Sequence, residues 1–89
     1  MKSFNVNYYI KVKLTDLGKE IYKHHDDEFL KEFPNLKPIP LNIDEQGYCK
    51  FQLWHFMNIF GEHFGNGFPL VIESNTILFE DKDLNEVTQ

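Results

Sequence analysis

Apolar and polar residues alternate without a break across residues 4–14, which predicts one long β-strand with a single buried face. The positions expected to face the core are Phe4, Val6, Tyr8, Ile10, Val12 and Leu14. The positions expected to face solvent are Asn5, Asn7, Tyr9, Lys11 and Lys13. This strand is expected to lead the sheet of the protein.

A helix is predicted to follow directly, over residues 15–33. Thr15 is a candidate N-cap, and Asp16 places a negative charge at the positive end of the helix dipole. Gly18 lowers helix propensity by up to about 1 kcal/mol, but its missing side chain would allow close approach to the sheet. The side expected to pack inward carries Leu17, Ile21, His25 and Phe29.

Prolines interrupt the chain after this helix. Pro34, Pro38 and Pro40 end the helix and predict an extended connector over residues 35–41, because proline lacks an amide donor and disfavours helix in the preceding residue. Ile39, Leu41 and Ile43 then alternate, residues 44–47 predict a tight turn, and residues 48–50 predict a short return strand.

A second amphipathic helix is predicted over residues 51–64, within a segment, 51–68, that holds six aromatic residues. The apolar stripe expected to enter the core is Leu53, Phe56, Met57, Phe60 and Phe64, with His55, Asn58 and Glu62 on the solvent side. Trp54 lies on the flank of the stripe beside Gly61. Residues 65–67, with sequence GNG, are expected to end the helix in a left-handed turn.

Two further apolar runs, residues 70–73 and 76–79, are separated by Ser74 and Asn75 and predict either a hairpin or one bent strand. The last residues are polar and acidic. We therefore expect a single α+β domain over residues 1–80, with a small, mostly antiparallel sheet and two helices packed on one face, and an acidic, frayed tail over residues 81–89.

Composition narrows the classes of function. The chain has 89 residues and a formal net charge of −5, with no arginine, which argues against direct nucleic-acid binding. No signal-peptide core and no apolar run of about 20 residues is present, and the single cysteine, Cys49, excludes an intrachain disulfide. We expect a cytoplasmic protein that does not insert into membranes. Domains of this size are often stabilised by a partner, and the sequence leaves open whether this protein forms a homo-oligomer.

Two histidine clusters were considered for metal binding or catalysis. His24 and Glu28 have the one-turn spacing of a helical metal site beside His25, Asp26 and Asp27, but a clear third ligand is missing. His55, Glu62 and His63 could form an acid and base pair, but no nucleophile accompanies them. We therefore predict no catalytic residues, no metal and no cofactor, and hence no enzyme.

Two groups of residues remain as candidates for binding a protein partner. Trp54, with Tyr9, Tyr22 and Tyr48, could form a contact surface or close the rim of the core, and the pattern leaves both open. Glu80, Asp81 and Asp83 form a negative cluster that could complement a basic channel. The predicted partner-binding residues are Trp54, His55, Asn58, Glu62, Glu80, Asp81 and Asp83.

The segments KLTDLGKEIY and GYCKFQLWHFMNIFGEHFGNGF are similar to those of a family of small proteins encoded by phages and prophages of low-GC Gram-positive bacteria. The pattern LTDLGKEIY followed by FQLWHFMNIFG carries most of the resemblance, which has no assigned catalytic or binding residues to transfer. The resemblance implies a phage accessory protein, and such proteins often inhibit host defence or replication machinery.

Together with this resemblance, these observations predict a stoichiometric inhibitor that acts in the host-cell cytoplasm on a host defence or replication protein, in particular an anti-defence protein of the anti-CRISPR kind that occludes a nucleic-acid-binding surface. The alternative is an oligomeric sponge for a nucleotide signal, with a pocket lined by aromatic residues and Lys11 or Lys13.

Overall fold

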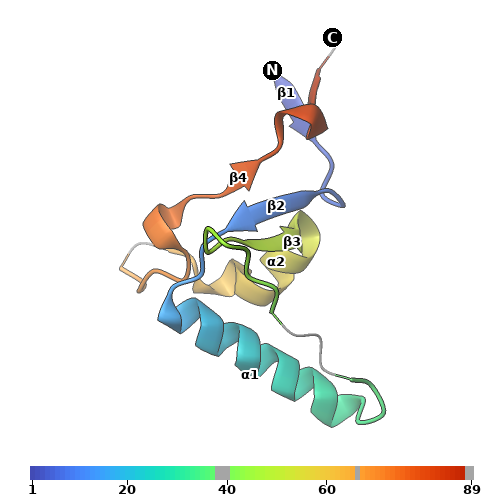
Figure 1. The fold of residues 1–89 in the computed structure, drawn as a ribbon, viewed down its shortest axis with the longest axis vertical. Coiled ribbons are helices and arrows are strands. Elements are labelled where there is room, and N and C mark those ends of the chain that lie inside the picture. The colour runs from blue at the N-terminus through green and yellow to red at the C-terminus, as the bar shows by residue number, and fades with distance from the viewer. Residues whose placement is uncertain (38–40, 66, 88–89) are drawn as a thin grey trace.

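The computed structural model describes residues 1–37, 41–65 and 67–87, and these form an α+β fold, which confirms the predicted class. Figure 1 shows helices α1 (Asp16–Glu32) and α2 (Leu53–Phe60) on one side of a central antiparallel sheet. A separate ribbon formed by the two chain ends lies at the opposite end of the molecule. The strands are β1 (Lys2–Phe4), β2 (Tyr9–Val12), β3 (Cys49–Gln52), β4 (Leu78–Phe79) and β5 (Leu84–Glu86).

The central sheet has the strand order β3-β2-β4, with both neighbours antiparallel to β2. Ile10 pairs with Phe51 and Val12 with Cys49, and all four side chains are buried on the helix side. The intervening pair, Lys11 with Lys50, lies on the other face because successive side chains alternate across a strand. The predicted alternation is confirmed for residues 10–14.

The predicted continuous strand over residues 4–14 is wrong at its centre. The chain turns at residues 5–8, between β1 and β2. In this turn the Tyr8 amide donates to the Asn5 carbonyl at 2.9 Å, and the Asn7 amide donates to Oδ1 of Asn5 at 2.8 Å. Asparagine favours such turns because its short side chain can accept a hydrogen bond from a nearby backbone amide.

This turn also leaves two expected core residues outside. The side chains of Val6 and Tyr8 are exposed. Their carbonyl oxygens instead accept hydrogen bonds from the amides of Trp54 and Leu53, each at 3.0 Å, at the start of α2. The first amides of a helix have no partner within the helix, so the turn satisfies two of them and fixes the position of α2.

Helix α1 confirms the predicted first helix. The Thr15 hydroxyl oxygen accepts from the Gly18 amide at 3.1 Å, and the same hydroxyl donates to the Leu70 carbonyl at 2.7 Å. Gly18 is buried, and a Cβ at this position would overlap the carbonyl oxygen of Val71. The expectation of close approach is confirmed, and the contacting backbone is the segment that carries Val71.

The connector after α1 lies partly outside the described residues, which include neither Pro38 and Pro40 nor Ile39. Beyond it the predicted tight turn is confirmed. The Gly47 amide donates to the Asp44 carbonyl at 3.0 Å, and Gly47 has a left-handed φ of 90°. The Asp44 carboxylate accepts from the amides of Gln46 and Tyr48 at 2.9 Å. These hydrogen bonds lower the pKa of Asp44, and the one from the Tyr48 amide has the largest effect.

Helix α2 is shorter than predicted at both ends. Strand β3 continues through Phe51 and Gln52, so the helix begins at Leu53, and it ends at Phe60 before a 3₁₀ turn at Gly61–His63. The expected left-handed terminator at residues 65–67 is therefore wrong as the end of this helix, which closes at Gly61 with a φ of −55°. Gly67 does have a positive φ, and Asn66 lies outside the described residues.

The buried side of α2 is also rotated from the predicted stripe. Phe56, Ile59 and Phe60 are buried, whereas Met57 is 48% exposed and Phe64 is 36% exposed. The prediction is correct for the two buried phenylalanines and wrong for Met57 and Phe64. The reason is that α2 contacts both the sheet and α1, so the buried side of the helix includes Ile59 in place of Met57.

The two apolar runs near the C-terminus do not pair with each other as a hairpin; both lie antiparallel to residues 10–14, and of these runs only Leu78–Phe79 forms a strand. Ile72 bridges to Leu14 just after β2, and β4 pairs with residues 10 and 11 of β2. Between them a 3₁₀ turn inserts residues 73–75, in which Ser74 and Asn75 have positive φ values of 56° and 49°.

The expected frayed tail is wrong for residues 81–87. A 3₁₀ turn at Asp81–Asp83 leads into β5, which pairs with β1. The Val87 amide donates to the Met1 carbonyl at 2.9 Å, and Lys2 forms an ion pair with Glu86 at 3.1 Å. The tail is ordered because the N-terminal strand supplies backbone partners. Residues 88 and 89 lie outside the described part.

One hydrophobic core joins the sheet, α2 and the segment before β4. Its buried members are Ile10, Val12, Leu14, Cys49, Phe51, Phe56, Ile59, Phe60, Val71 and Ile72. The C-terminal half of α1 extends past the central sheet, as Figure 1 shows.

Candidate functional site

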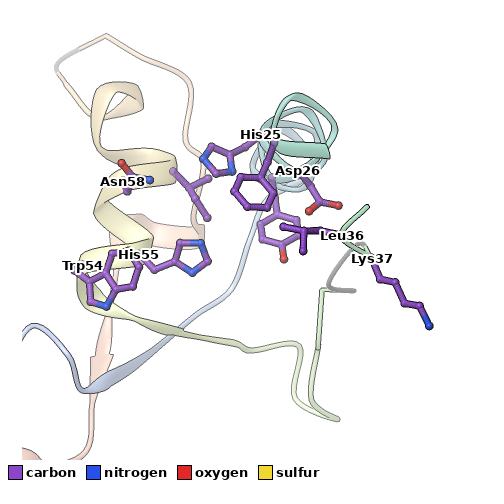
Figure 2. A pocket seen from close by; sticks show the side chains of 10 residues that line it. His25, Asp26, Leu36, Lys37, Trp54, His55 and Asn58 are labelled. Carbon is purple, nitrogen blue, oxygen red and sulfur yellow. The ribbon is translucent and has the colours of Figure 1, made fainter. Parts of the chain in front are cut away.

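A cavity with a volume of about 520 Å³ lies between α1 and α2. Its walls come from three segments: α1 from Tyr22 to Phe29, residues 36 and 37, and α2 from Trp54 to Ile59 (Figure 2). The lining residues are Tyr22, His25, Asp26, Phe29, Leu36, Lys37, Trp54, His55, Asn58 and Ile59. Cavities of about 300–1,000 Å³ are typical of sites for small ligands.

Helix α1 contributes residues spaced at i, i+3, i+4 and i+7, which places them on one helical side. Tyr22 packs against Phe51, with ring centroids 5.9 Å apart, and so closes the inner end toward the core. Burial, with a further effect of the Asp26 and Cys49 charges, raises the pKa of Tyr22. The phenol therefore stays protonated near neutral pH and can donate a hydrogen bond.

Helix α2 contributes Trp54, His55 and Asn58. The Trp54 and His55 rings lie side by side, with centroids 5.3 Å apart and planes tilted by 34°. Trp54 is 46% exposed, and its backbone amide is held by the turn at residues 5–8, as described above. The tryptophan is therefore an open aromatic surface on a fixed backbone.

The structure corrects the predicted place of His55. It was expected on the solvent side of α2, but it is half-buried and points toward α1, as Figure 2 shows. Burial, with a smaller effect of the charge on His25, lowers the pKa of His55. His25 points into the same gap from α1, which confirms the expectation that it turns inward. An uncharged imidazole at neutral pH can both donate and accept a hydrogen bond.

The seven predicted partner-binding residues divide into separate places. Trp54, His55 and Asn58 line the α1–α2 cavity. Glu62 borders a smaller hollow of about 150 Å³ on the other side of α2, where its carboxylate lies 3.6 Å from His63. The acidic residues of the tail lie farther along the chain, where Glu80 and Asp83 line a cavity near the β2–β3 edge and Asp81 is exposed.

The α1 half of the cavity was missed as a site. His25 and Phe29 were predicted to face inward but were interpreted as core residues, while Tyr22 was considered only as an aromatic candidate. The available signal was the joint spacing of Tyr22, His25, Asp26 and Phe29 on one helical side. The contribution of Leu36 and Lys37 follows from the path of the connector, which the sequence pattern did not show.

A second arrangement lies on the face of the sheet opposite the helices. Lys11, Tyr48 and Lys50 line a cavity of about 220 Å³ with Asn42 and Asp44. One aromatic residue, Tyr48, thus meets Lys11 in this cavity, which is separate from that between the helices.

The His24–Glu28 pair and the Cys49 thiol, the groups relevant to metal binding and nucleophilic catalysis, lie outside the walls of these cavities. Within residues 1–37, 41–65 and 67–87, no set of three or more His, Cys, Asp or Glu side chains is arranged to hold a metal ion. The His24–Glu28 pair lies at 3.9 Å, with both side chains largely exposed. Cys49 is buried in the core, and burial raises the pKa of its thiol.

The described part of the chain contains no helix with the length and apolar character needed to cross a bilayer. No protein-family model, no curated protein and no solved structure matches this chain. The geometry of the two cavities and the charges around them are therefore the basis for assigning a function.

Proposed function

We propose that the protein is a non-enzymatic, stoichiometric inhibitor that binds a host protein by receiving one of its apolar side chains in the α1–α2 cavity. One observation carries this proposal: two nearly half-exposed aromatic side chains, Trp54 at 46% and Phe29 at 45%, border the same cavity from opposite helices. Tryptophan and other aromatic residues at the centre of an interface commonly supply most of its binding energy.

The magnitudes favour a contact larger than the two rings. Burying the exposed half of each ring removes on the order of 100 Å² from water, or about 2.5 kcal/mol per side chain. Association costs about 4–15 kcal/mol in lost translation and rotation, so Trp54 and Phe29 alone are insufficient. The partner must also fill the cavity between them, where Ile59 offers apolar contact and Asn58 and His55 offer hydrogen bonds.

The polar groups of the cavity suit an uncharged or aromatic insert. Burial lowers the pKa of His55 and raises the pKa of Tyr22, and both effects favour the neutral forms of these side chains. Asp26 supplies one carboxylate to the wall, and the Lys37 side chain points away from the cavity centre in Figure 2. A tyrosine or tryptophan of the partner would place its ring against Trp54 or Phe29 and its polar atom toward these groups.

The class of partner rests on the resemblance to phage-encoded proteins. A host defence or replication protein is the target that this resemblance suggests, with an anti-CRISPR-like inhibitor as one form. Occlusion of a nucleic-acid channel by carboxylates is less well supported, because Glu80 and Asp83 line another cavity. The proposed mechanism therefore depends on the aromatic cavity.

A second candidate function is binding of a small apolar molecule in the same cavity, and the volume of about 520 Å³ favours it. Native mass spectrometry of protein purified from host cells distinguishes the two. A bound small molecule that is lost from the Trp54→Ala variant would support this second function over the first.

Affinity purification from the host, followed by work with the purified target, tests the main proposal. The wild-type chain is compared with the Trp54→Ala/Phe29→Ala variant and with Phe68→Ala, in which an exposed phenylalanine away from the cavity is truncated. We expect wild type and Phe68→Ala to retain one target and to inhibit it at a 1:1 ratio, while the double variant binds at least tenfold more weakly.

Circular dichroism of the three proteins controls for folding. Equal retention of the target by all three variants would contradict the assignment of the cavity. A target whose activity is unchanged by a large molar excess of wild-type protein would contradict inhibition.

A further inference from the structure

The sheet face opposite the helices gathers positive charge in a chain whose net charge is −5. Lys11 and Lys13 alternate with buried residues along β2 and its continuation, and Lys50 lies on β3 directly opposite Lys11. Lysines paired in this way repel each other, and directly opposed like charges destabilise a sheet. An anion between them would remove this repulsion.

Two tyrosines hold the outer lysines of this group in place. The Lys13 ammonium lies over the Tyr48 ring, 4.8 Å from its centroid, and the Lys50 ammonium lies over the Tyr9 ring at 5.2 Å. Such cation–π contacts restrict long side chains that would otherwise be mobile. Lys50 and Lys13 are thus ordered on either side of Lys11.

Among the residues that the structure describes, the three lysines form no close ion pair with a carboxylate. In the described ranges, no carboxylate lies within 4.0 Å of the ammonium groups of Lys11, Lys13 and Lys50, whereas Lys2 and Lys31 each have such a partner. Asp44 lines the same cavity, and the Lys11 charge contributes to its lowered pKa. Its carboxylate, however, accepts the amides of Gln46 and Tyr48.

A concave site accompanies the charge. The cavity of about 220 Å³ is lined by Lys11 and Lys50 on the sheet and by Asn42, Asp44 and Tyr48 from the connector and its turn. The Asn42 amide adds an uncharged donor beside the two ammonium groups. The volume is sufficient for a phosphate group and part of an attached organic group.

The surroundings favour a short anion over a nucleic-acid strand. Beyond Lys50 the surface continues into another cavity, where the carboxylates of Glu80 and Asp83 outnumber the one further lysine, Lys82. A strand that extended from Lys11 past Lys50 would bring its next phosphates against these carboxylates. Like charges repel, so these carboxylates disfavour an anion that extends beyond Lys50.

We propose that this face binds a small phosphate ester with an aromatic group, such as a nucleoside mono- or diphosphate. The phosphate lies between Lys11 and Lys50 and accepts from Asn42, and the aromatic group packs beside Tyr48. This site is separate from the α1–α2 cavity and goes beyond the proposed inhibition of a host protein.

Isothermal titration calorimetry with ADP, pyrophosphate, adenosine and a twelve-residue oligothymidine tests the proposal. We expect 1:1 binding of ADP that weakens as salt rises, and at least tenfold weaker binding of adenosine, which lacks phosphate. Lys11→Gln and Lys50→Gln should each weaken ADP binding at least tenfold. Lys23→Gln on α1 removes the same charge from an exposed position and should leave binding within twofold.

Thermal unfolding separates loss of binding from loss of folding. Lys11→Gln should unfold at the wild-type temperature or higher without ligand, because it removes the Lys11–Lys50 repulsion, and ADP should raise the unfolding temperature of wild type only. Binding of neither ADP nor pyrophosphate at millimolar concentration would overturn the proposal. Equal weakening by Lys23→Gln, or tighter binding of oligothymidine than of ADP, would also overturn it.

The Trp54→Ala variant keeps the two proposals distinguishable. It should bind ADP like wild type, since Trp54 contributes only to the other cavity. Loss of ADP binding in Trp54→Ala, with folding intact, would contradict a separate site on the sheet.

Discussion

The two halves of helix α1 have different surroundings, and they separate stability from binding. The first half begins at the Thr15 cap and brings Gly18 against the Val71 backbone, where a side chain does not fit. The second half extends past the core and ends in Phe29 and Phe33, whose rings lie 5.0 Å apart and are both exposed. The first half fixes the helix, while the second presents one wall of a cavity.

This difference has a general lesson for small domains. With only about 90 residues, a chain has a single core to stabilise it, and exposed aromatic residues then remain unburied unless a partner covers them. Anchoring one end of a long helix allows the other end to carry such residues without loss of the fold. Substitutions in each half should therefore affect different measurements.

The largest effect is expected at Gly18. In Gly18→Ala the new Cβ overlaps the Val71 carbonyl oxygen, so the helix must shift, and we expect a loss of about 3 kcal/mol of unfolding free energy. Urea denaturation measures this change. Gly61→Ala is the matched control, because a Cβ there meets no heavy atom within 4 Å, and it should be neutral or stabilising by up to about 1 kcal/mol. Equal effects at both glycines would contradict the claim that the contact between Gly18 and the Val71 backbone fixes the first half of α1.

A smaller effect is expected at the cap. Thr15→Ala removes the acceptor for the Gly18 amide and the donor to the Leu70 carbonyl, and it should cost about 1 kcal/mol. Thr15→Ser keeps both groups and should retain most of the stability. Chemical denaturation of the three proteins is the measurement, and a serine variant as unstable as the alanine variant would show that the hydroxyl is not what stabilises this end.

In the second half, Phe29→Ala should change stability by less than about 1 kcal/mol, because the ring is already 45% exposed. The same variant should weaken partner binding strongly, since the ring borders the cavity. Denaturation and calorimetry on the same sample provide the two values. A large loss of stability would mean that Phe29 supports the fold and would break the contrast between the halves.

The smallest effect is a dependence on pH at His55. Its folded-state pKa is lowered below the ordinary value of about 6.5, so the unfolded chain binds the proton more readily. Stability from the neutral form is present above pH 6.5 and declines as the pH falls toward the folded-state pKa. Urea denaturation at pH 7.5 and 5.5 should show a greater loss for wild type than for His55→Gln, with the exposed His24→Gln as control. A His55→Gln protein with the wild-type pH dependence would contradict this effect.

Local signals predicted the parts of the fold that depend on neighbouring residues. The Thr15 cap on the Gly18 amide and the Asp44 turn are set by side chains and backbone within a few positions, so they could be interpreted from the sequence. The segment that contacts Thr15 and Gly18, at Leu70 and Val71, is distant in the chain and was not predicted. The inward series Ile10, Val12 and Leu14 follows the alternation of a strand.

The remainder depends on contacts between distant segments. Alternation continues through residues 5–8, yet the chain turns there, where the Asn7 carbonyl accepts from the Gln52 side chain at 3.0 Å and neighbouring carbonyls accept from α2. Apolar residues occur around most of α2, so the pattern alone did not show that Ile59 and His55 would face α1. The candidate site was half predicted, through Trp54, His55 and Asn58, because its other wall comes from the second half of α1.

Position-specific photo-crosslinking in host cells tests most directly whether the α1–α2 cavity receives a partner. A photoreactive phenylalanine analogue is placed singly at Trp54, at Phe29 or at Phe68, and crosslinked proteins are identified by mass spectrometry. We expect one host protein to crosslink at positions 54 and 29 and not at position 68. Crosslinking of the same protein at position 68 as efficiently as at the other two, or no crosslink at either cavity position, would contradict the account.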